Sequence, residues 1–556
     1  MPVGRRPRRS ARPRRRRLAA PIVAATLLAA CSGAGAAPAG APAAAEAPTP
    51  AGRAAPTLVV LFTVDQLRQD YFTRFERQLT GGLGRLWRGG AVFTEAYQDY
   101  AVTETAPGHA STLSGRFPRS TRILNNRLGV PDPNMPLVGS QATGASPLRF
   151  EGTTLVDWIA ARDRRSRALS VSGKDRGAIL PIGRSRQSVF WYDGTTGRFT
   201  TSRYYADTLP TWLTRFNARR LPQGVAGRVW MPLLADTAYA EPDSVPFEAG
   251  GKSFTFPYAL PADSAAAAQV VAGTPWMDEI TLTAALAGVR AMNLGGGRST
   301  DVLAVSLSTT DAIGHRYGPD SREIHDQVVR LDRALGAFLD SLYALRDSTR
   351  VVIALTADHG VTGFPELTRA RTGQDARWVD LKDAIDRTQQ WLDARGAGGT
   401  AGIALASGML FVDKAVLAKA RVGPDSVAAF FAAAASGVPG VLRVDRAASL
   451  ATADTVRDAI ARRWLHMLPP QAPIAAVVTL TPGSLWGMPG GSASHGSPHD
   501  LDAHVPLILY GPPFATGRYD QFVRVADLAP TLARVVGVPP TERLDGRVLE
   551  RAVASH

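Results

Sequence analysis

Five short apolar runs constrain the fold of this chain more than any other feature of its sequence. They are rich in leucine and β-branched residues, each is bounded by polar residues, and they cover residues 58–63, 168–172, 302–307, 351–355 and 505–509. Such runs are typical of strands buried on both faces of a parallel or mixed sheet. The segments between them carry helical patterns, such as the apolar stripe of Leu331, Leu335, Phe338, Leu339 and Leu342. This alternation predicts an α/β fold with a central, mostly parallel sheet and helices on both faces.

Local signals predict two further helices and one loop. Thr274 and Pro275 suit the N-cap and the first position of a helix that ends near Gly295. A final helix is expected to include residues 525–536. The stretch TETAPGH, residues 103–109, contains a Pro-Gly pair and on its own predicts a loop.

The N-terminal segment has the composition of an export signal. Residues 5–17 hold nine arginines and no acidic residue, and an apolar run over residues 18–30 follows directly. This pattern predicts a secretory signal in residues 1–30. Cys31, the only cysteine of the chain, follows Leu-Ala-Ala and resembles the lipidated first residue of a bacterial lipoprotein. The alternatives are an ordinary signal peptide with an incidental cysteine, or an arginine-rich arm that binds nucleic acid.

The arginines also account for most of the positive charge. The formal net charge of +15 falls by these nine charges to +6 when residues 1–30 are removed, which gives little support for a nucleic-acid partner. We therefore expect a periplasmic protein, or one anchored to the outer membrane only through a lipid on Cys31. Residues 31–56 are rich in Ala, Pro and Gly and predict a tether, so that the folded domain is expected over residues 57–556.

Polar side chains follow four of the predicted strands at the point where each strand ends. Because sites form at the carboxyl ends of strands in an open α/β sheet, we expect these side chains to lie close together. Another histidine, His495, lies just before the fifth strand. The residues that follow the four strands are Asp65, Lys174 and Arg176, Asp311 and His315, and Asp358 and His359.

Three aspartates and three histidines at one edge of a sheet suit Zn²⁺, which binds Asp oxygen and His nitrogen. Asp311 and His315 are four residues apart, so on a helical turn both would face the same way. Six ligands exceed one tetrahedral site, but they suit two sites with positions left for water, a nucleophile or a substrate. Two neighbouring metal ions suit displacement at phosphorus, and a metal can turn a threonine hydroxyl into a nucleophile.

Each of these residues has a simpler explanation when it is taken alone. An aspartate after a strand usually caps a turn or a helix, and a lone histidine is more often structural than a ligand. Capping does not explain His315, His359 and His495 together, so the joint pattern favours a metal site.

Eight motifs, in order along the chain, resemble those of the alkaline phosphatase superfamily, and within it the bacterial phosphate-irrepressible type of alkaline phosphatase. They span about residues 57–536 and read VLFTVDQLRQDY, TETAPGHASTLSGRFP, ILNNRLG, SGKDRGAIL, FWYDGTTGRFTTSRYYADTLPTWLTRFN, TTDAIGHRYGP, TADHG and SHGSPHDLDAHVPLILYG. The resemblance implies an alkaline phosphatase-like fold, two Zn²⁺ ions, a threonine nucleophile, and a monomer that hydrolyses small phosphate monoesters. We also expect an inserted, cap-like segment over about residues 180–275.

The resemblance gives specific residues their roles. Thr105 matches the nucleophile, and Thr103 has the wrong spacing to Asn126 for that role. Asn126, 21 residues after Thr105, matches an amide that donates to a phosphoryl oxygen, and Lys174 and Arg176 match the contacts to the remaining phosphoryl oxygens. The implied ligands are Asp311, His315 and His495 for one Zn²⁺, and Asp65, Asp358 and His359 with Thr105 for the other.

The chain departs from the family pattern near these residues. RILNNRLG lacks the aromatic residue that often follows the Asn, and His499 stands where an aromatic residue is usual after HGSP. Both departures bear on the preferred leaving group more than on the reaction. His109 and His504 have a metal-binding side chain, but we expect them to be structural.

Three alternatives compete with a phosphomonoesterase. A nucleotide pyrophosphatase-type phosphodiesterase of the same superfamily shares the metal ligands, the nucleophile and the Asn, but lacks the Lys-x-Arg contact, because a diester carries one charge fewer. Lys174 and Arg176 therefore favour monoesters. A transferase acting on lipid or cell-wall glycan is disfavoured because no transmembrane run follows residue 30, and a pure binding protein is disfavoured because it would not need Thr105.

Overall fold

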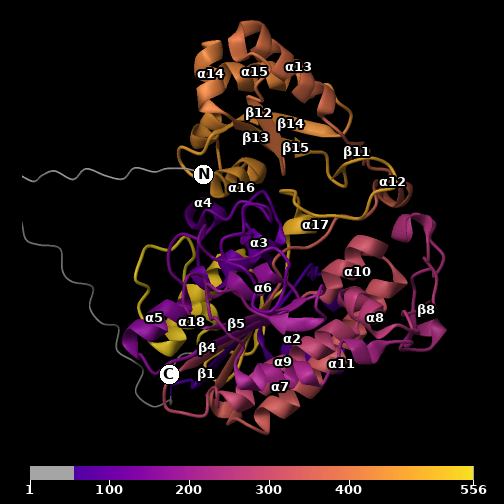
Figure 1. Cartoon of the computed structure of the whole chain (residues 1–556), viewed down its shortest axis with the longest axis vertical. Coiled ribbons are helices and arrows are strands. Elements are labelled where there is room, and N and C mark those ends of the chain that lie inside the picture. The colour runs from indigo at the N-terminus through magenta and orange to yellow at the C-terminus, as the bar shows by residue number, and fades with distance from the viewer. Residues whose placement is uncertain (1–54, 555–556) are drawn as a thin grey trace, which may run out of the picture. The chain divides into compact units, whose positions relative to one another are not determined.

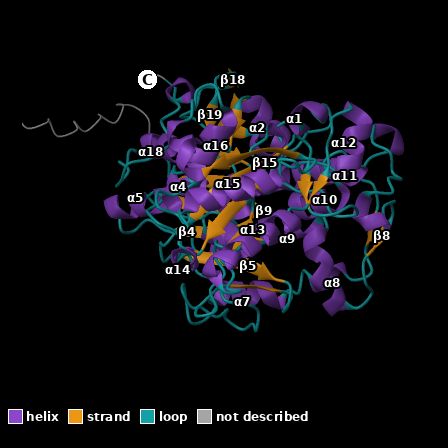
Figure 2. Cartoon of the chain, turned by 90° about the horizontal axis from the view of Figure 1, so that it is seen from above, coloured by secondary structure: helices purple, strands orange, loops and turns teal. Residues whose placement is uncertain are grey.

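The computed structural model describes residues 55–554, which Figures 1 and 2 draw from two directions. The predicted export signal, Cys31 and all but the last two residues of the predicted tether lie outside the described residues. Among the helices of residues 55–554, none combines the length and the apolar composition that crossing a membrane requires.

A nine-stranded mixed sheet forms the main layer of this part of the chain. Its strand order is β18-β2-β17-β10-β1-β9-β4-β5-β6, and the five central strands from β10 to β5 run parallel to one another. The strands are β1 (Leu58–Val64), β2 (Ala91–Phe93), β4 (Ala168–Ser172), β5 (Ser188–Asp193), β6 (Arg198–Thr200), β9 (Asp301–Leu307), β10 (Val351–Thr356), β17 (Leu507–Tyr510) and β18 (Gly517–Tyr519). The predicted α/β fold with a mostly parallel central sheet is therefore confirmed, and all five predicted strands are present.

Helices pack around this sheet in two groups, and Figure 1 shows the sheet between them. One group contains α2 (Gly82–Gly89), α7 (Thr211–Ala218), α9 (Trp276–Ala291) and α11 (Arg322–Tyr343). The other group contains α3 (Thr105–Ser114), α5 (Leu155–Arg162), α6 (Asp175–Ile179) and α18 (Leu528–Val536).

The predicted apolar stripe attaches α11 to the sheet. All five of its residues, from Leu331 to Leu342, are buried, and the ring of Phe338 meets the ring of Phe62 in β1 edge-on at a centroid distance of 5.6 Å. A single helix is only marginally stable in water. Burial of each large apolar side chain stabilises the folded state by about 1.5–3 kcal/mol, so packing against the sheet supplies most of the stability of α11.

Helix α9 begins one residue later than its capping signals predict. Its first residue is Trp276, and Thr274 Oγ1 donates a hydrogen bond of 2.8 Å to the carbonyl of Val271 instead of capping the helix. The final predicted helix is divided into a 3-10 turn, Val525–Asp527, and α18.

A second, four-stranded antiparallel sheet was not predicted from the sequence. Its strand order is β12-β13-β15-β14, and it lies in the orange segment of Figure 1. The strands are β12 (Ile403–Ala406), β13 (Met409–Val412), β14 (Val441–Arg446) and β15 (Ile474–Leu480). A separate hydrophobic cluster joins the sheet to α13 (Lys382–Leu392), α14 (Lys414–Ala420) and α15 (Pro424–Ala435).

The stretch expected to form an insertion is divided differently in the structure. Within residues 180–275, β5 and β6 belong to the main sheet rather than to a cap. Residues 201–275 contribute no strand to that sheet, so a cap-like insertion there stays a prediction, and a longer interruption covers residues 357–506, between β10 and β17, and contains the second sheet.

The second sheet also packs against the segment that precedes Thr105. Met409 of β13 and Val477 of β15 belong to one buried cluster with Tyr100 and Val102, and Trp464 of α16 (Ala459–Met467) completes it. This cluster therefore supports the segment that leads to residues 103–105 from the side of the second sheet.

A buried carboxylate reinforces this contact. Asp99 accepts hydrogen bonds from Arg462 at 3.1 Å and from Arg524 at 2.8 Å, and it lies 3.4 Å from Nδ1 of His466. Burial alone would raise the pKa of Asp99, but His466 and Arg524 lower it to about 2. The charged Asp99 thus links α16 to the main part of the chain near Thr105.

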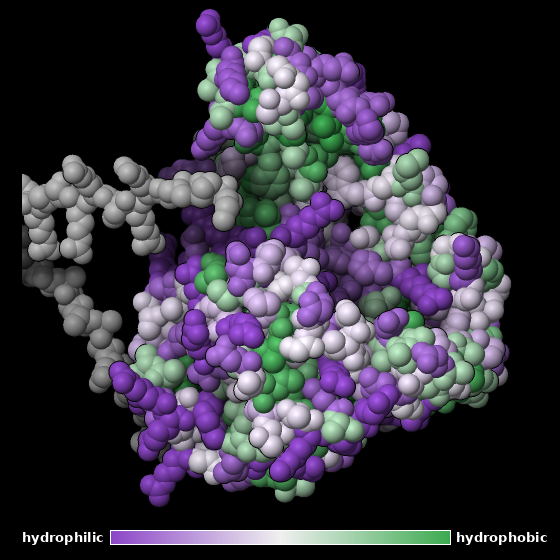
Figure 3. Space-filling model, in the orientation of Figure 1, coloured by the Kyte–Doolittle hydropathy of each residue, from purple (hydrophilic) through white to green (hydrophobic). Residues whose placement is uncertain are grey.

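In the space-filling view of Figure 3, hydrophilic and hydrophobic residues are interspersed over the visible face, while the large apolar clusters lie inside.

Short elements complete the described chain. The remaining strands pair as β3 (Ala96–Tyr97) with β19 (Val523–Arg524), β7 (Val229–Trp230) with β8 (Tyr258–Ala259), and β11 (Trp378–Val379) with β16 (Leu485–Trp486). The remaining α-helices are α1 (Tyr71–Arg74), α4 (Pro118–Thr121), α8 (Ser264–Val270), α10 (Thr309–Tyr317), α12 (Pro365–Thr372) and α17 (Asp500–Ala503).

Candidate active site

Thr105 lies at the start of a helix rather than in a loop. It is the first residue of α3, so the loop predicted for residues 103–109 is wrong from Thr105 onwards. The Pro-Gly pair misleads here because proline is tolerated in the first helical turn, where N–H groups lack intrahelical partners. Thr105 is buried, and its Oγ1 lies 3.4 Å from Nε2 of His359.

Gly108 allows α3 to approach the strand end that carries Asp358. A Cβ atom at Gly108 would lie 2.3 Å from the carbonyl oxygen of Asp358 and 2.5 Å from its Cβ. Both distances are far below van der Waals contact, so any larger residue would separate the helix from β10. The absence of a side chain at this position therefore sets how close Thr105 lies to Asp358 and His359.

Asp65, Asp358 and His359 meet at the carboxyl ends of β1 and β10. All three are fully buried, and each offers one ligand atom within 4.8 Å of those of the others. Oδ1 of Asp65 and Oδ2 of Asp358 lie 3.4 Å and 3.5 Å from Nε2 of His359. Within residues 55–554, Oδ1 of Asp65 has no hydrogen-bond partner, whereas Oδ2 of Asp358 lies 3.1 Å from Nδ1 of His109. A buried polar atom without a partner is costly, so this arrangement fits a bound cation.

A second group of ligand atoms shares His359 with the first. Asp311, His359 and His495 again offer atoms within 4.8 Å of one another, and the rings of His359 and His495 stack at 3.5 Å. Nε2 of His315, one turn after Asp311 on α10, lies 3.2 Å from Oδ1 of Asp311. The structure thus brings all six predicted ligands together, and it places His359 within reach of both groups.

Backbone carbonyls orient the three histidines in the same way. A carbonyl oxygen only accepts hydrogen bonds, so each Nδ1 carries the hydrogen and each Nε2 keeps a lone pair for a metal. Metal-binding histidines are commonly fixed by such a contact. The pairs are His315 Nδ1 with Ala493 O at 2.7 Å, His359 Nδ1 with Gly360 O at 2.9 Å, and His495 Nδ1 with Thr103 O at 2.8 Å.

The charge states also suit a divalent cation. Burial raises the pKa of Asp65 well above its ordinary value, and repulsion from Asp311 and Asp358 adds to the rise. Burial lowers the pKa of His359 to about 3, so that its imidazole is neutral at pH 7. A divalent cation would offset the repulsion among the carboxylates and would bind the neutral imidazole.

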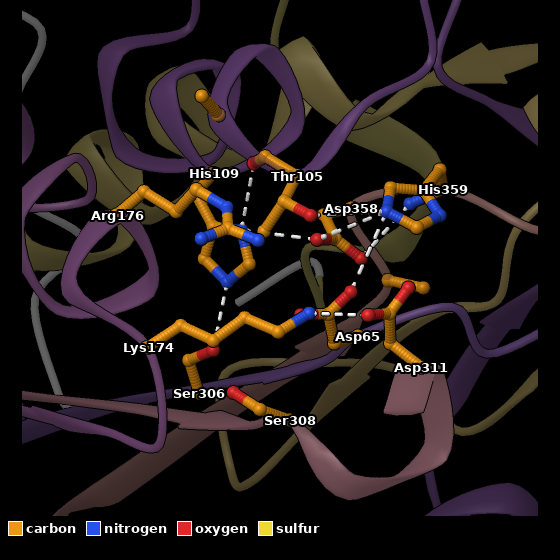
Figure 4. A network of polar contacts seen from close by, with 12 residues as sticks. Asp65, Thr105, His109, Lys174, Arg176, Ser306, Ser308, Asp311, Asp358 and His359 are labelled. Atoms are coloured by element: carbon orange, nitrogen blue, oxygen red, sulfur yellow. Dashed lines mark hydrogen bonds and ion pairs between the residues drawn. The ribbon is translucent and has the colours of Figure 1, made fainter. Parts of the chain in front are cut away.

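Lys174 neutralises part of the negative charge, as Figure 4 shows. Its Nζ donates a hydrogen bond of 2.6 Å to Oδ2 of Asp65 and a further one to Oδ2 of Asp311. Burial would lower the pKa of Lys174, but the carboxylates of Asp311 and Asp65 raise it. Lys174 therefore contacts the predicted metal ligands, and its contact with a phosphoryl oxygen stays a prediction.

Arg176 and Asn126 also lie close to Thr105. Figure 4 shows the guanidinium of Arg176 beside Thr105, and its Nε is buried without a hydrogen-bond partner among the described residues. Oδ1 of Asn126 accepts a hydrogen bond of 2.9 Å from the backbone N–H of Ala106 in α3.

One site residue, Gln66, was missed in the sequence. The backbone N–H of Gln66 donates to Asp358 at 3.1 Å and its Nε2 donates to Asp311 at 2.7 Å, so it bridges the two ligand groups. Its φ of 66° is rarely adopted by residues other than glycine, and no sequence signal reveals it. His109 was expected to be structural, and its Nδ1 lies 2.9 Å from the carbonyl of Thr105 and 3.1 Å from Oδ2 of Asp358.

A separate cavity of about 680 Å³ contains none of the predicted site residues. His499, which replaces the usual aromatic residue, lines this cavity, and its Nε2 lies 2.8 Å from the carbonyl of Leu480. Nε2 of His504 likewise lies 2.7 Å from the carbonyl of Thr94.

Replacing Gly108 with alanine should disturb the site through packing alone. The added methyl group must displace Asp358 or α3, at a cost of about 1–3 kcal/mol as for other overpacked positions. We expect Gly108→Ala to lower the melting temperature and the amount of divalent metal bound per chain, measured by calorimetry and by elemental analysis. Gly224→Ala is the matched control, because nothing lies within 4 Å of a Cβ atom there. Unchanged metal content in Gly108→Ala would show that the close approach does not position Asp358.

Comparisons with known proteins agree with this geometry. Residues 59–440 match the family described as type I phosphodiesterase/nucleotide pyrophosphatase. The chain is 38% identical over 335 residues to alkaline phosphatase PhoV of Synechococcus elongatus, covering 57% of this chain and 61% of PhoV. It is 30% identical over 511 residues to alkaline phosphatase PafA of Elizabethkingia meningoseptica, covering 87% and 92%, and 31% identical over 525 residues to alkaline phosphatase PhoK of a Sphingomonas species, covering 89% and 91%.

The similarity extends to solved structures. The crystal structure of wild-type PafA matches with a TM-score of 0.84 at 28% identity, covering 91% of this chain and all of that chain. A PafA variant in which a Thr, an Asn, a Lys and an Arg are replaced matches with a TM-score of 0.83 at 27% identity, with the same coverage. The alignment with PhoV spans about three fifths of that protein, whereas those with PafA and PhoK span nine tenths. These relatives confirm the prediction of a phosphatase enzyme, and the chain belongs to the type I phosphodiesterase/nucleotide pyrophosphatase family.

Proposed function

We propose that this phosphatase hydrolyses small phosphate monoesters through a covalent phosphothreonine at Thr105. The observation that carries the proposal is the gathering of two cationic side chains, Lys174 and Arg176, beside Thr105 and the buried carboxylates (Figure 4). The replacement of a Thr, an Asn, a Lys and an Arg in the PafA variant involves the residue types of Thr105, Asn126, Lys174 and Arg176, and so supports the assignment.

We propose two Zn²⁺ ions as the cofactors. Asp and His side chains are ligands that Zn²⁺ prefers, and Oδ1 of Asp65, which lacks a partner among the described residues, supports a cation in the first group. When bound, such ions neutralise the charge of a phosphoryl group and lower the pKa of a coordinated hydroxyl. The proposed ligands are Asp65, Asp358 and His359 with Thr105 for one ion, and Asp311, His315 and His495 for the other.

In this proposal Thr105 is the nucleophile, and Lys174, Arg176 and Asn126 bind the phosphoryl oxygens. Oγ1 of Thr105 attacks phosphorus, so that the bond from Oγ1 to phosphorus forms as the bond to the ester oxygen breaks. Water then attacks the same phosphorus, releases inorganic phosphate and regenerates Thr105. Throughout, Arg176 and Lys174 balance the charge on the equatorial oxygens, and the amide of Asn126 donates to one of them.

The alternative is hydrolysis of phosphodiesters, which the name of the matching family includes. A monoester places three non-bridging oxygens and up to two negative charges in the site, whereas a diester places two oxygens and one charge. Two cations beside the nucleophile favour the more highly charged substrate, because charge-assisted hydrogen bonds are about twice as strong as neutral ones.

The preference can be measured with an aryl phosphate monoester and its methyl diester in the presence of Zn²⁺. We expect kcat/KM to be much higher for the monoester. In Lys174→Ala and Arg176→Ala it should fall by about 10²–10³-fold, the loss typical of removing one donor to a transition-state oxyanion. The diester should lose less activity in both variants.

Arg184→Ala serves as the control, because Arg184 lies on the same segment and donates to the carbonyl of Leu148 from an exposed position. A higher kcat/KM for the diester in the unmodified protein would replace the monoesterase proposal with the phosphodiesterase alternative.

The covalent step predicts a trapped intermediate. Thr105→Ala should lose at least about 10³-fold in kcat, because removing a nucleophile abolishes the covalent route. Rapid acid quenching of the unmodified enzyme during turnover should leave a phosphate on the peptide that contains Thr105, detectable by mass spectrometry. Thr105→Ser should retain part of the activity and of the modification. Phosphate on a different residue would contradict the assignment.

We further propose that the protein is an exported monomer, lipidated at Cys31, which releases phosphate outside the cytoplasm. This proposal rests on the arginine-rich start, the apolar run and the single cysteine. In a bacterial host, the full-length chain should take up a labelled fatty acid and sediment with membranes, and Cys31→Ala should do neither. Equal labelling of both chains would exclude lipidation at this residue.

A further inference from the structure

Glu104, directly before the proposed nucleophile, accepts hydrogen bonds from Asn126 and from Ser407, which lie far apart in the sequence. It is the N-cap residue of α3, yet within the described chain its side chain makes no capping hydrogen bond. Oε2 of Glu104 instead accepts from the backbone N–H of Asn126 at 2.8 Å, and Oε1 accepts from Oγ of Ser407 at 2.6 Å. One carboxylate thus connects the proposed phosphate-binding amide with the second sheet.

The backbone contact with Glu104 fixes the orientation of Asn126. The side chain of Asn126 faces the N–H of Ala106, so the facing atom must be the acceptor Oδ1. Nδ2 takes no part in this contact and remains able to donate. Because Glu104 holds the backbone of Asn126 and Ala106 holds its Oδ1, the direction of Nδ2 is determined by the start of α3 itself.

Ser407 occupies a position that serine rarely takes. It lies in the two-residue turn between β12 and β13, where Ser407 and Gly408 have φ values of 49° and 74°. Turns of this type favour Asn, Asp or Gly at the first position, so a serine there costs conformational energy. The hydroxyl compensates through its hydrogen bond with Glu104.

We propose that Glu104 and Ser407 are positioning residues for phosphoryl transfer, through which the turn of the second sheet orients the Asn126 amide toward a phosphoryl oxygen. This inference rests on the proposed function, because it requires Asn126 to contact the phosphoryl group. Three consecutive residues, 103–105, each contact or supply a residue of the proposed site. Thr103 holds His495 through its carbonyl, Glu104 holds Asn126, and Thr105 supplies the nucleophile.

A double-mutant cycle with Asn126→Ala tests the inference, because a residue that acts through Asn126 cannot matter once the amide is gone. Glu104→Gln replaces one carboxylate oxygen with a donor while it preserves size, and Ser407→Ala removes only the hydroxyl. We expect kcat/KM for an aryl phosphate monoester to fall by about tenfold in Glu104→Gln and about threefold in Ser407→Ala, values within the range of coupling between contacting residues. In the Asn126→Ala background both effects should shrink to less than about twofold.

The inhibition constant of inorganic phosphate provides a second readout, which reports on phosphate binding rather than on the rate of the chemical step. Phosphate should inhibit Glu104→Gln and Ser407→Ala more weakly than the unmodified enzyme, and equally weakly once Asn126→Ala is present. Ser436→Ala is the matched control, because this exposed serine of the same part donates only to the carbonyl of Ala432. Bound Zn²⁺ and the melting temperature should be close to those of the unmodified enzyme in Ser407→Ala, which keeps the test valid if Glu104→Gln folds poorly.

Three outcomes separate the inference from the proposed function. If Asn126→Ala lowers activity but the Ser407→Ala and Glu104→Gln effects persist unchanged in its background, the two residues are structural and only this inference fails. If Asn126→Ala lowers activity and Ser407→Ala has no effect in the unmodified enzyme, the link to the second sheet is overturned. If Asn126→Ala itself leaves monoester hydrolysis and phosphate inhibition unchanged, both the inference and the assignment of Asn126 fail.

Discussion

Three aspartates are buried within a few ångströms of one another, and the repulsion among their carboxylates is the constraint on which the rest of the site depends. Asp65, Asp311 and Asp358 end up in an environment where isolated carboxylates are strongly disfavoured, and the pKa of Asp65 rises in response to burial and to its two neighbours. The ammonium of Lys174 and two N–H groups of Gln66 donate hydrogen bonds to these carboxylates. Three histidines lie beside them with Nε2 facing the carboxylates. The same concentration of negative charge makes the edge of the sheet a place for divalent cations and, with them, for anionic substrates.

The main sheet and its polar edge could be predicted because both depend on local composition. A strand buried on both faces needs an unbroken apolar run, so the five runs stood out, and in a parallel sheet the residues after each run converge. The histidines could be predicted as a group because capping and turn formation do not require imidazoles. The motif order along the chain added the roles of individual residues, which no periodicity could supply.

Other features depend on contacts between distant segments and left little trace in the sequence. Strands β12 and β13 are four residues each, and half of β12 is alanine, so at this length neither strand differs from helix or loop segments by pattern alone. The Pro-Gly pair in TETAPGH gave a false loop signal, since Gly108 serves the approach of α3 to Asp358 rather than a turn. Gln66 bridges two carboxylates only because its backbone adopts a left-handed conformation that composition does not reveal.

The packing of the second sheet on the segment around Tyr100 and Val102 has a consequence for attempts to shorten this enzyme. Residues 382–480, which hold the second sheet and its helices, lie between two strands of the main sheet and contain none of the proposed metal ligands, so they look like a module that could be trimmed or exchanged for the equivalent part of a relative. Their removal would strip a hydrophobic face from the chain just before Thr105, leave Asp99 without the Arg462 that α16 supplies, and take away the only described partner of Oε1 of Glu104. A chimera would therefore keep the full rate only if the donor part brought a hydroxyl to the same point in space, so the choice of donor part is coupled to the start of α3.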